Sequence, residues 1–142
     1  MIPEYTFTEE DRIVAKERAT WIQNPNEFTE LGFLGETLFE HFFPHSRYVN
    51  SRDYDFYSKL CRIEIKTTSV HVSIDHINKV FAAANTEDKD YDYLVFTAVK
   101  TTLACGWILG WITKEKFLSQ ATLDKYYTLP RSFLTPFSAD QF

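Results

Sequence analysis

The sequence predicts a single α/β (α+β) domain with a central mixed β-sheet and helices on both of its faces. The chain has 142 residues, of which 44% are hydrophobic, enough for one sizeable core and too few for two domains. Apolar residues recur at helical spacing in some segments and alternate in others. Segments 91–99 and 103–112 are nearly continuous apolar runs, which is typical of strands covered on both sides.

The first two predicted elements are helices. Thr8 is followed by three acidic residues, an N-cap pattern, and apolar residues then recur at helical spacing to about Gln23. The Asn-Pro-Asn run at 24–26 interrupts this pattern. Thr29 is expected to cap a second helix, whose wide apolar stripe ends at Pro44.

Beyond Arg47 the apolar period changes to two, which predicts strands at 47–50, 53–58 and 60–68. We interpret the last two as an antiparallel hairpin that turns near Ser58 and Lys59, although no Asn-Gly pair marks the turn. Ser73 and Asp75 then predict a third helix over 74–86.

The two apolar strands come next, and Thr113 is expected to cap a short helix over 114–120. The resulting order of elements, ααβββαββα, predicts helices on both faces of the sheet.

Composition limits the class of protein. The formal net charge of −5 argues against coating nucleic acid by bulk charge, although a local basic groove remains compatible with it. No apolar run approaches the roughly 20 residues of a membrane span, and the N-terminal segment lacks the layout of a signal peptide. We therefore expect a soluble, intracellular (cytoplasmic) protein with no membrane partner. Cys61 and Cys105 lie in apolar strand-like segments and are expected to be reduced thiols.

One predicted strand carries an unusual pair of charges. In Ile63–Thr68, IEIKTT, alternation places Glu64 and Lys66 on one face and the isoleucines on the other. A hairpin turning at 58–60 would bring Asp53 or Asp55 directly across from Glu64, with Cβ atoms about 4.5–5.5 Å apart. The residues alone leave the choice between the two aspartates open.

Carboxylates facing one another destabilise a sheet unless their charge is neutralised. A divalent cation such as Mg²⁺ would neutralise them, since it binds one or two protein carboxylates together with waters and phosphate oxygens. It would also activate a bound water toward a phosphodiester, and Lys66 could orient that water or stabilise developing charge. The pattern therefore favours a phosphodiesterase.

At these residues the chain resembles the PD-(D/E)xK nuclease superfamily, whose motif pairs an aspartate with a later Glu-x-Lys. The resemblance implies a restriction-endonuclease-like αβα sandwich and a Mg²⁺ or Mn²⁺ cofactor. It implies that Asp55 and Glu64 are metal ligands and that Lys66 is the catalytic lysine. The backbone carbonyl of Ile65 would be a further ligand, and Asp53 is the rival of Asp55.

The segment ELGFLGETLFEHFF resembles the first core helix of archaeal Holliday-junction resolvases and related members of the superfamily. The resemblance implies that Glu36 faces the metal as a catalytic residue. Gly32 and Gly35 each cost a helix roughly 1 kcal/mol relative to alanine, so we expect a close approach that requires them. Such an approach would place the helix near the charged pair.

Five basic residues are candidates for contact with a nucleic-acid backbone. Arg47, Arg52, Lys59 and Arg62 cluster around the predicted hairpin, and Lys79 lies in the predicted third helix. A phosphate backbone bound there would lose affinity as salt concentration rises.

The sequence thus predicts a metal-dependent DNA endonuclease of restriction, homing or junction-resolving type, which uses a metal-activated water and forms no covalent intermediate. Cleavage of duplex or branched DNA would require a homodimer or a higher homo-oligomer. The alternative is a catalytically inactive, nuclease-like DNA-binding or scaffold subunit in which the charged residues form salt bridges. An RNA or single-stranded substrate is also compatible with the sequence.

Overall fold

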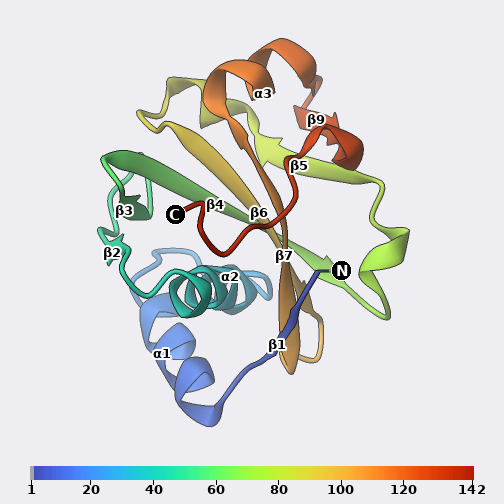
Figure 1. Ribbon diagram of the computed structural model, residues 1–142. Helices are drawn as coiled ribbons and strands as arrows, with labels where there is room; N and C mark the ends of the chain where they lie inside the picture. The colour runs from blue at the N-terminus through green and yellow to red at the C-terminus, as the bar shows by residue number, and fades with distance from the viewer. Residues whose placement is uncertain (1) are drawn as a thin grey trace.

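A six-stranded mixed sheet forms the centre of the chain, which the computed structural model describes over residues 2–142 (Figure 1). Its strand order is β1-β7-β6-β4-β3-β2. Strands β4 and β6 run parallel, and the other neighbours are antiparallel. The strands are β1 Glu4–Thr6, β2 Arg47–Tyr48, β3 Phe56–Ser58, β4 Cys61–Val70, β6 Tyr93–Lys100 and β7 Cys105–Thr113.

Helices α1 (Glu9–Ala19) and α2 (Thr29–Phe42) cover one face of this sheet. Thr8 is the N-cap of α1, as predicted, and its hydroxyl accepts from the Asp11 amide at 3.1 Å. The helix ends at Ala19, earlier than predicted. Phe28 is the N-cap of α2, so Thr29 is the first residue of the helix and not its cap. The Thr29 hydroxyl accepts from the amide of Asn26 at 2.9 Å.

The opposite face is covered by α3 (Lys114–Gln120) and by a small sheet of order β5-β9-β8. These strands are β5 Lys79–Ala83, β8 Thr122–Leu123 and β9 Tyr126–Pro130. Alternation along β6 directs Val95 toward α2 and Phe96 toward α3, so one strand contributes to two cores. The mixed α+β class with a central sheet is confirmed, and Thr113 caps α3 as predicted.

The predicted third helix over 74–86 is wrong. Its residues form a 3₁₀ turn at Ile74–His76, strand β5, and a second 3₁₀ turn at Ala84–Asp88. Val80 and Ala82 are buried while Lys79, Phe81 and Ala83 are exposed, which is the alternation of a strand. Pairing with β9, more than forty residues later in the chain, decides this outcome. Strands β1, β8 and β9 were also not predicted, and a third 3₁₀ turn, Arg131–Phe133, follows β9.

The β3–β4 hairpin is confirmed. Ser58 pairs with Cys61, which leaves a two-residue turn at Lys59 and Leu60. Both turn residues have positive φ angles, 49° and 65°, as the favoured two-residue hairpin turns of type I′ require. The turn therefore forms without glycine, and it fixes the register of the strands that follow.

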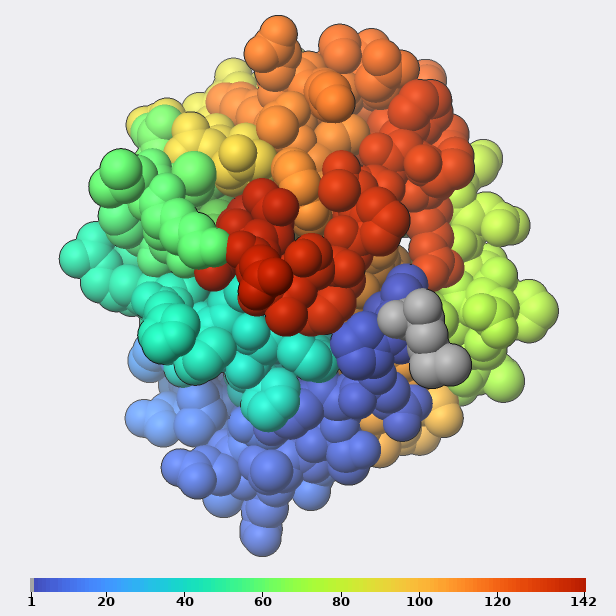
Figure 2. All heavy atoms as spheres, in the orientation of Figure 1, coloured from blue at the N-terminus to red at the C-terminus, as the bar shows by residue number. Residues whose placement is uncertain are grey.

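The C-terminal segment crosses the front of the molecule in Figure 2, between the segments of α2 and α3. Trp111 of β7 exchanges backbone hydrogen bonds with Thr135, and Phe142 is buried against the α2 side of the core. Among residues 2–142, no helix has the length and apolar character that a bilayer span requires.

Candidate active site

One cavity of about 320 Å³ brings together the four side chains that the sequence singles out. Glu36 lies on α2, Asp55 immediately precedes β3, and Glu64 and Lys66 lie on β4. The backbone of Ile65 lies between the last two, and this residue also lines the cavity. Elements remote from one another in the sequence thus converge on one small volume.

The register of the hairpin places Asp55 opposite Glu64, because Phe56 pairs with Ile63. The Asp55 amide donates to the Ile63 carbonyl at 2.9 Å, and the Ile65 amide donates to Asp55 Oδ2 at 2.8 Å. This carboxylate accepts the hydrogen bond that a continuing β3 backbone would otherwise take. Asp55 therefore stands where β3 separates from β4 and opens the edge of β4.

Asp53, the rival of Asp55, does not line this cavity. It lies in a turn closed by the Ser51 amide, which donates to the Tyr54 carbonyl at 3.3 Å, and by the Tyr54 amide, which donates to Ser51 Oγ at 3.1 Å. This turn joins β2 to β3 and ends before the segment that faces β4. The geometry favours Asp55 as the aspartate of the site.

Glu64 is almost fully buried, with 4% of its surface exposed, and contacts two ammonium groups. Its Oε2 lies 3.6 Å from Lys66 Nζ and 2.9 Å from Lys89 Nζ. Lys89 was not identified from the sequence, where it stands in the charged run EDKD that is typical of a solvated surface segment. The parallel pairing of β4 with β6 brings the residues preceding β6 beside Glu64.

Glu36 has a perturbed environment. Burial raises its pKa from 4.5 to about 7, while the nearby Tyr48 hydroxyl and Arg18 guanidinium oppose the rise and Glu64 adds to it. Its Oε1 is buried without a hydrogen-bond partner among the described residues. An unpartnered buried carboxylate oxygen is costly, and it leaves one coordinating atom available in the cavity.

Asp55 is perturbed more strongly. Its pKa is raised from 3.8 to about 10, mainly by burial and then by the charges of Glu36 and Glu64, whereas the hydrogen bond from the Ile65 amide opposes the rise. Three carboxyl groups therefore repel one another around one cavity. A divalent cation would reverse this balance and favour their ionised forms.

The donor set fits a hard cation such as Mg²⁺, which binds carboxylate oxygens, carbonyl oxygens and waters. Glu36, Asp55 and Glu64 supply the carboxylates, and the unpartnered Glu36 Oε1 is free to serve. As they stand, no three His, Cys, Asp or Glu side chains in residues 2–142 are arranged to hold a metal ion. Both ammonium contacts of Glu64 are made by Oε2, so a cation would be bound through Oε1 or would displace a lysine from Oε2.

The two glycines of α2 have different surroundings. A Cβ on Gly35 would lie 1.9 Å from Thr67 Oγ1 and 2.6 Å from Thr97 Oγ1, so this glycine permits α2 to contact the sheet. A Cβ on Gly32 would meet nothing within 4 Å, and Gly32 lines the cavity one helical turn from Glu36. The predicted close approach thus applies to Gly35, and Gly32 leaves room in the cavity.

Comparison of the chain with protein-family models and with curated proteins found no match. The candidate site therefore rests on the chemistry of its own residues and on the geometry that gathers them.

The basic residues proposed to contact phosphate lie outside this cavity. Arg62 is engaged by Asp90 at 2.6 Å and by Asp92 at 3.0 Å, and Lys59 donates to the Asp140 carbonyl. Arg47 lies over the ring of Tyr57. Arg52 is exposed in the turn before β3, and Lys79 is exposed on β5.

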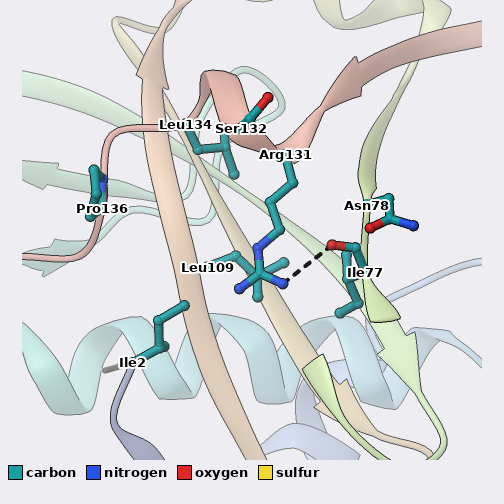
Figure 3. Close-up of a pocket in the computed structure, with 8 residues that line it drawn as sticks. All are labelled: Ile2, Ile77, Asn78, Leu109, Arg131, Ser132, Leu134 and Pro136. Atoms are coloured by element: carbon teal, nitrogen blue, oxygen red, sulfur yellow. Dashed lines mark hydrogen bonds between the residues drawn. The ribbon is translucent and has the colours of Figure 1, made fainter. Parts of the chain in front are cut away.

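A larger cavity, of about 570 Å³, lies between the C-terminal segment and the segment before β5 (Figure 3). Its charged side chain, Arg131, donates to the carbonyl of Ile77 at 3.2 Å and to that of Ile74. No carboxylate lines it. The guanidinium holds two chain segments together, and the cavity lacks the groups needed for phosphodiester chemistry.

Proposed function

We propose that the chain is a Mg²⁺- or Mn²⁺-dependent endonuclease that hydrolyses phosphodiester bonds of DNA. The observation that carries this proposal is the convergence of Glu36, Asp55, Glu64 and Lys66 on one cavity at the open edge of β4. Perturbed titratable groups gathered in a cleft are typical of catalytic sites. The restriction, homing and junction-resolving roles all belong to this class.

The order of elements supports a restriction-endonuclease-like fold. Helix α2 is followed by the antiparallel strands β2, β3 and β4, and β6 then returns parallel to β4. This order resembles the core of the PD-(D/E)xK superfamily. The departure is the connection from β4 to β6, where β5 and two 3₁₀ turns replace the expected helix.

Each side chain has a role that its position supports. A cation held by the three carboxylates and the Ile65 carbonyl would polarise the scissile phosphate and lower the pKa of a water. The Ile65 amide fixes the Asp55 carboxylate through its 2.8 Å hydrogen bond. Lys66, with 20% of its side chain exposed, can reach both Glu64 and a phosphate entering the cavity, where it would stabilise developing negative charge.

One chain provides one such cavity, so one chain cuts one strand. Cleavage of both strands of a duplex, or of a branched junction, requires two copies in a symmetric assembly. The proposal therefore includes a homodimer or higher homo-oligomer on duplex or branched DNA.

The test is incubation of the purified protein with supercoiled, linear and four-way-junction DNA, in Mg²⁺ and in EDTA. The proposal expects cleavage that requires the cation and is lost in Lys66→Ala and Asp55→Asn. Lys16→Ala, an exposed lysine on α1, is the matched control and should cleave like the wild type. Cleavage in EDTA, or cleavage that Lys66→Ala leaves unchanged, would contradict the proposed mechanism.

A second candidate is a nuclease-like subunit that binds DNA or acts as a scaffold without cutting it. The contacts of Glu64 with both Lys66 and Lys89 favour this candidate, because the two ammonium groups already balance the buried carboxylate. Thermal unfolding separates the two candidates. A nuclease should be stabilised by Mg²⁺ in the wild type and not in Asp55→Asn, whereas a scaffold should be indifferent to the cation in both.

A further inference from the structure

A groove adjoins the candidate active-site cavity along the open edge of β4. The groove has a volume of about 720 Å³ and shares Phe28 and Thr67 with that cavity. It continues over Thr68 and Ser69 to Phe81 and Tyr126, and we call this surface the aromatic groove. A further hollow of about 330 Å³ extends it past Phe81 to Lys79 and His76.

Three aromatic side chains along the aromatic groove are half exposed. Phe28 is 54% exposed, Phe81 44% and Tyr126 50%. They come from three separate elements: the residue before α2, β5 and β9. Large apolar side chains gathered on one surface, and not scattered singly, indicate a binding surface.

The small sheet positions two of these rings. Phe81 and Lys79 point outward from β5 because Val80 and Ala82 point into the core. Tyr126 pairs with Ala83, which places its ring diagonally from Phe81, with centroids 5.5 Å apart. The outer face of this sheet thus presents adjacent aromatic rings with a lysine beside them.

Most of the groove lining is apolar, and Thr67, Thr68 and Ser69 of β4 supply its hydroxyl groups. Strand β3 pairs with β4 only through Cys61–Ile63, so the edge at Thr67–Ser69 is not paired by β3, and hydroxyl-bearing side chains follow one another there. Exposed aromatic rings beside hydroxyl groups, with Lys79 in the adjoining hollow, resemble the surfaces on which single-stranded nucleic acid binds. Bases stack on the rings, and the backbone lies against polar and cationic groups.

We propose that the aromatic groove binds unpaired nucleotides next to the scissile bond, so that the substrate is single-stranded DNA or DNA unwound at the cleavage point. This inference rests on the proposed function, because it takes the adjoining cavity as the place of cleavage. Duplex DNA hides the faces of its bases inside the stack and could not use these rings. The net charge of −5 argues against binding by bulk charge, so the affinity would have to come from local contacts such as these rings.

The experiment measures binding without cleavage. Fluorescence anisotropy of labelled single-stranded and duplex oligonucleotides is recorded in EDTA with the Lys66→Ala protein. Adding Phe81→Ala or Tyr126→Ala should weaken single-strand binding by roughly 5- to 100-fold and leave duplex binding unchanged. Phe133→Ala, which removes an aromatic ring 49% exposed outside the groove, should leave both unchanged.

A conservative variant separates stacking from other effects. Tyr126→Phe keeps the ring and should retain single-strand affinity, whereas Tyr126→Ala should not. Equal affinity of all variants for single strands, or equal losses on duplex and single strands, would overturn the inference. Loss of a dimer in Phe81→Ala, seen by sedimentation, would also overturn it and assign the groove to contact between copies.

The outcome is independent of catalysis. Single-strand binding that depends on Phe81 and Tyr126, in a protein that cuts no DNA under any condition, would support the proposed nucleotide-binding groove and contradict the proposed nuclease activity. Cation-dependent cutting of DNA that does not depend on Phe81 or Tyr126 would support the proposed nuclease activity and contradict nucleotide binding in the groove.

Discussion

The ammonium of Lys89 lies 2.9 Å from Glu64 Oε2, nearer than the ammonium of Lys66 at 3.6 Å. The Glu-x-Lys pair is thus part of a three-residue ion cluster, and the closer partner is the lysine outside the motif. A cation bound to Glu64 would lie near the positive charge of Lys89, which opposes its binding. If the proposed metal site is correct, the charge of Lys89 should weaken binding of the cation.

Lys89→Met should lower the free energy of unfolding by about 1–3 kcal/mol when Mg²⁺ is absent, because a buried carboxylate loses its nearest partner. Added Mg²⁺ should restore more stability to this variant than to the wild type, since the competing ammonium is gone. Urea unfolding with and without Mg²⁺ measures both effects. Lys16→Met is the exposed control, and a variant with unchanged stability would show that the contact is inconsequential.

The raised pKa values of Glu36 and Asp55 predict a pH dependence of stability without Mg²⁺. Each group binds its proton more tightly in the folded protein, so each stabilises the fold fully below its unfolded pKa, near 4. That contribution is lost as pH rises toward about 7 for Glu36 and about 10 for Asp55. Unfolding free energy should therefore fall as pH increases from 5 to 9.

Neutral replacements test the origin of this slope. Asp55→Asn keeps an oxygen to accept from the Ile65 amide, removes the repelling charge, and should flatten the slope while raising stability near neutral pH. Glu36→Gln should do the same over a narrower range. Mg²⁺ should stabilise the wild type most at high pH and should have little effect on Asp55→Asn. Stability that rises with pH in both proteins alike would refute the assignment.

Asp55, Glu64 and Lys66 have a local signal in the sequence, which also left Asp53 as an alternative, whereas Glu36 on α2 was assigned only from the family resemblance. Alternation along 60–68 places Glu64 and Lys66 together, and the short hairpin turn brings Asp55 across from Glu64. Lys89 carries no such signal, because its position depends on parallel pairing of β4 and β6 with a long connection between them. Long-range pairing is set by the whole core and not by the neighbouring sequence.

The structure of segment 74–86 likewise could not be predicted from the neighbouring sequence, because it depends on long-range strand pairing. Its apolar residues fit a helical spacing, yet Val80 and Ala82 are buried by a partner strand near the C-terminus. A helix and a strand both satisfy the short pattern KVFAA, and the tertiary partner decides between them. In the proposed function the segment matters because β5 carries Phe81 to the aromatic groove and Lys79 to the hollow beside it.

The two glycines of α2 give opposite predictions. Gly35→Ala should destabilise the protein by about 1–3 kcal/mol, because the new Cβ would collide with Thr67 and disrupt its 2.8 Å hydrogen bond with Thr97. Gly32→Ala should stabilise it by roughly 0.5–1 kcal/mol through helix propensity alone. Thermal unfolding of the two variants measures the contrast.

A larger side chain at Gly32 separates stability from activity. Gly32→Leu should fold, because the position is open. It should reduce both DNA cleavage and the stabilisation of the fold by Mg²⁺, since leucine would fill the cavity beside Glu36. Gly32→Ala serves as its control. Full activity in a folded Gly32→Leu protein would place the reaction elsewhere.

Two basic residues proposed to contact DNA should behave differently. Arg62 is paired with Asp90 and Asp92, so Arg62→Ala should lower the unfolding temperature and leave the salt dependence of DNA binding unchanged. Lys79 is exposed beside the aromatic groove, and Lys79→Ala should reduce the slope of log affinity against log salt by about 0.7 to 0.9. Titrations at several salt concentrations measure both slopes. A reduced salt slope in Arg62→Ala would show that Arg62 leaves Asp90 and Asp92 and contacts a phosphate when DNA binds. The β3–β4 hairpin would then be part of the DNA-binding surface.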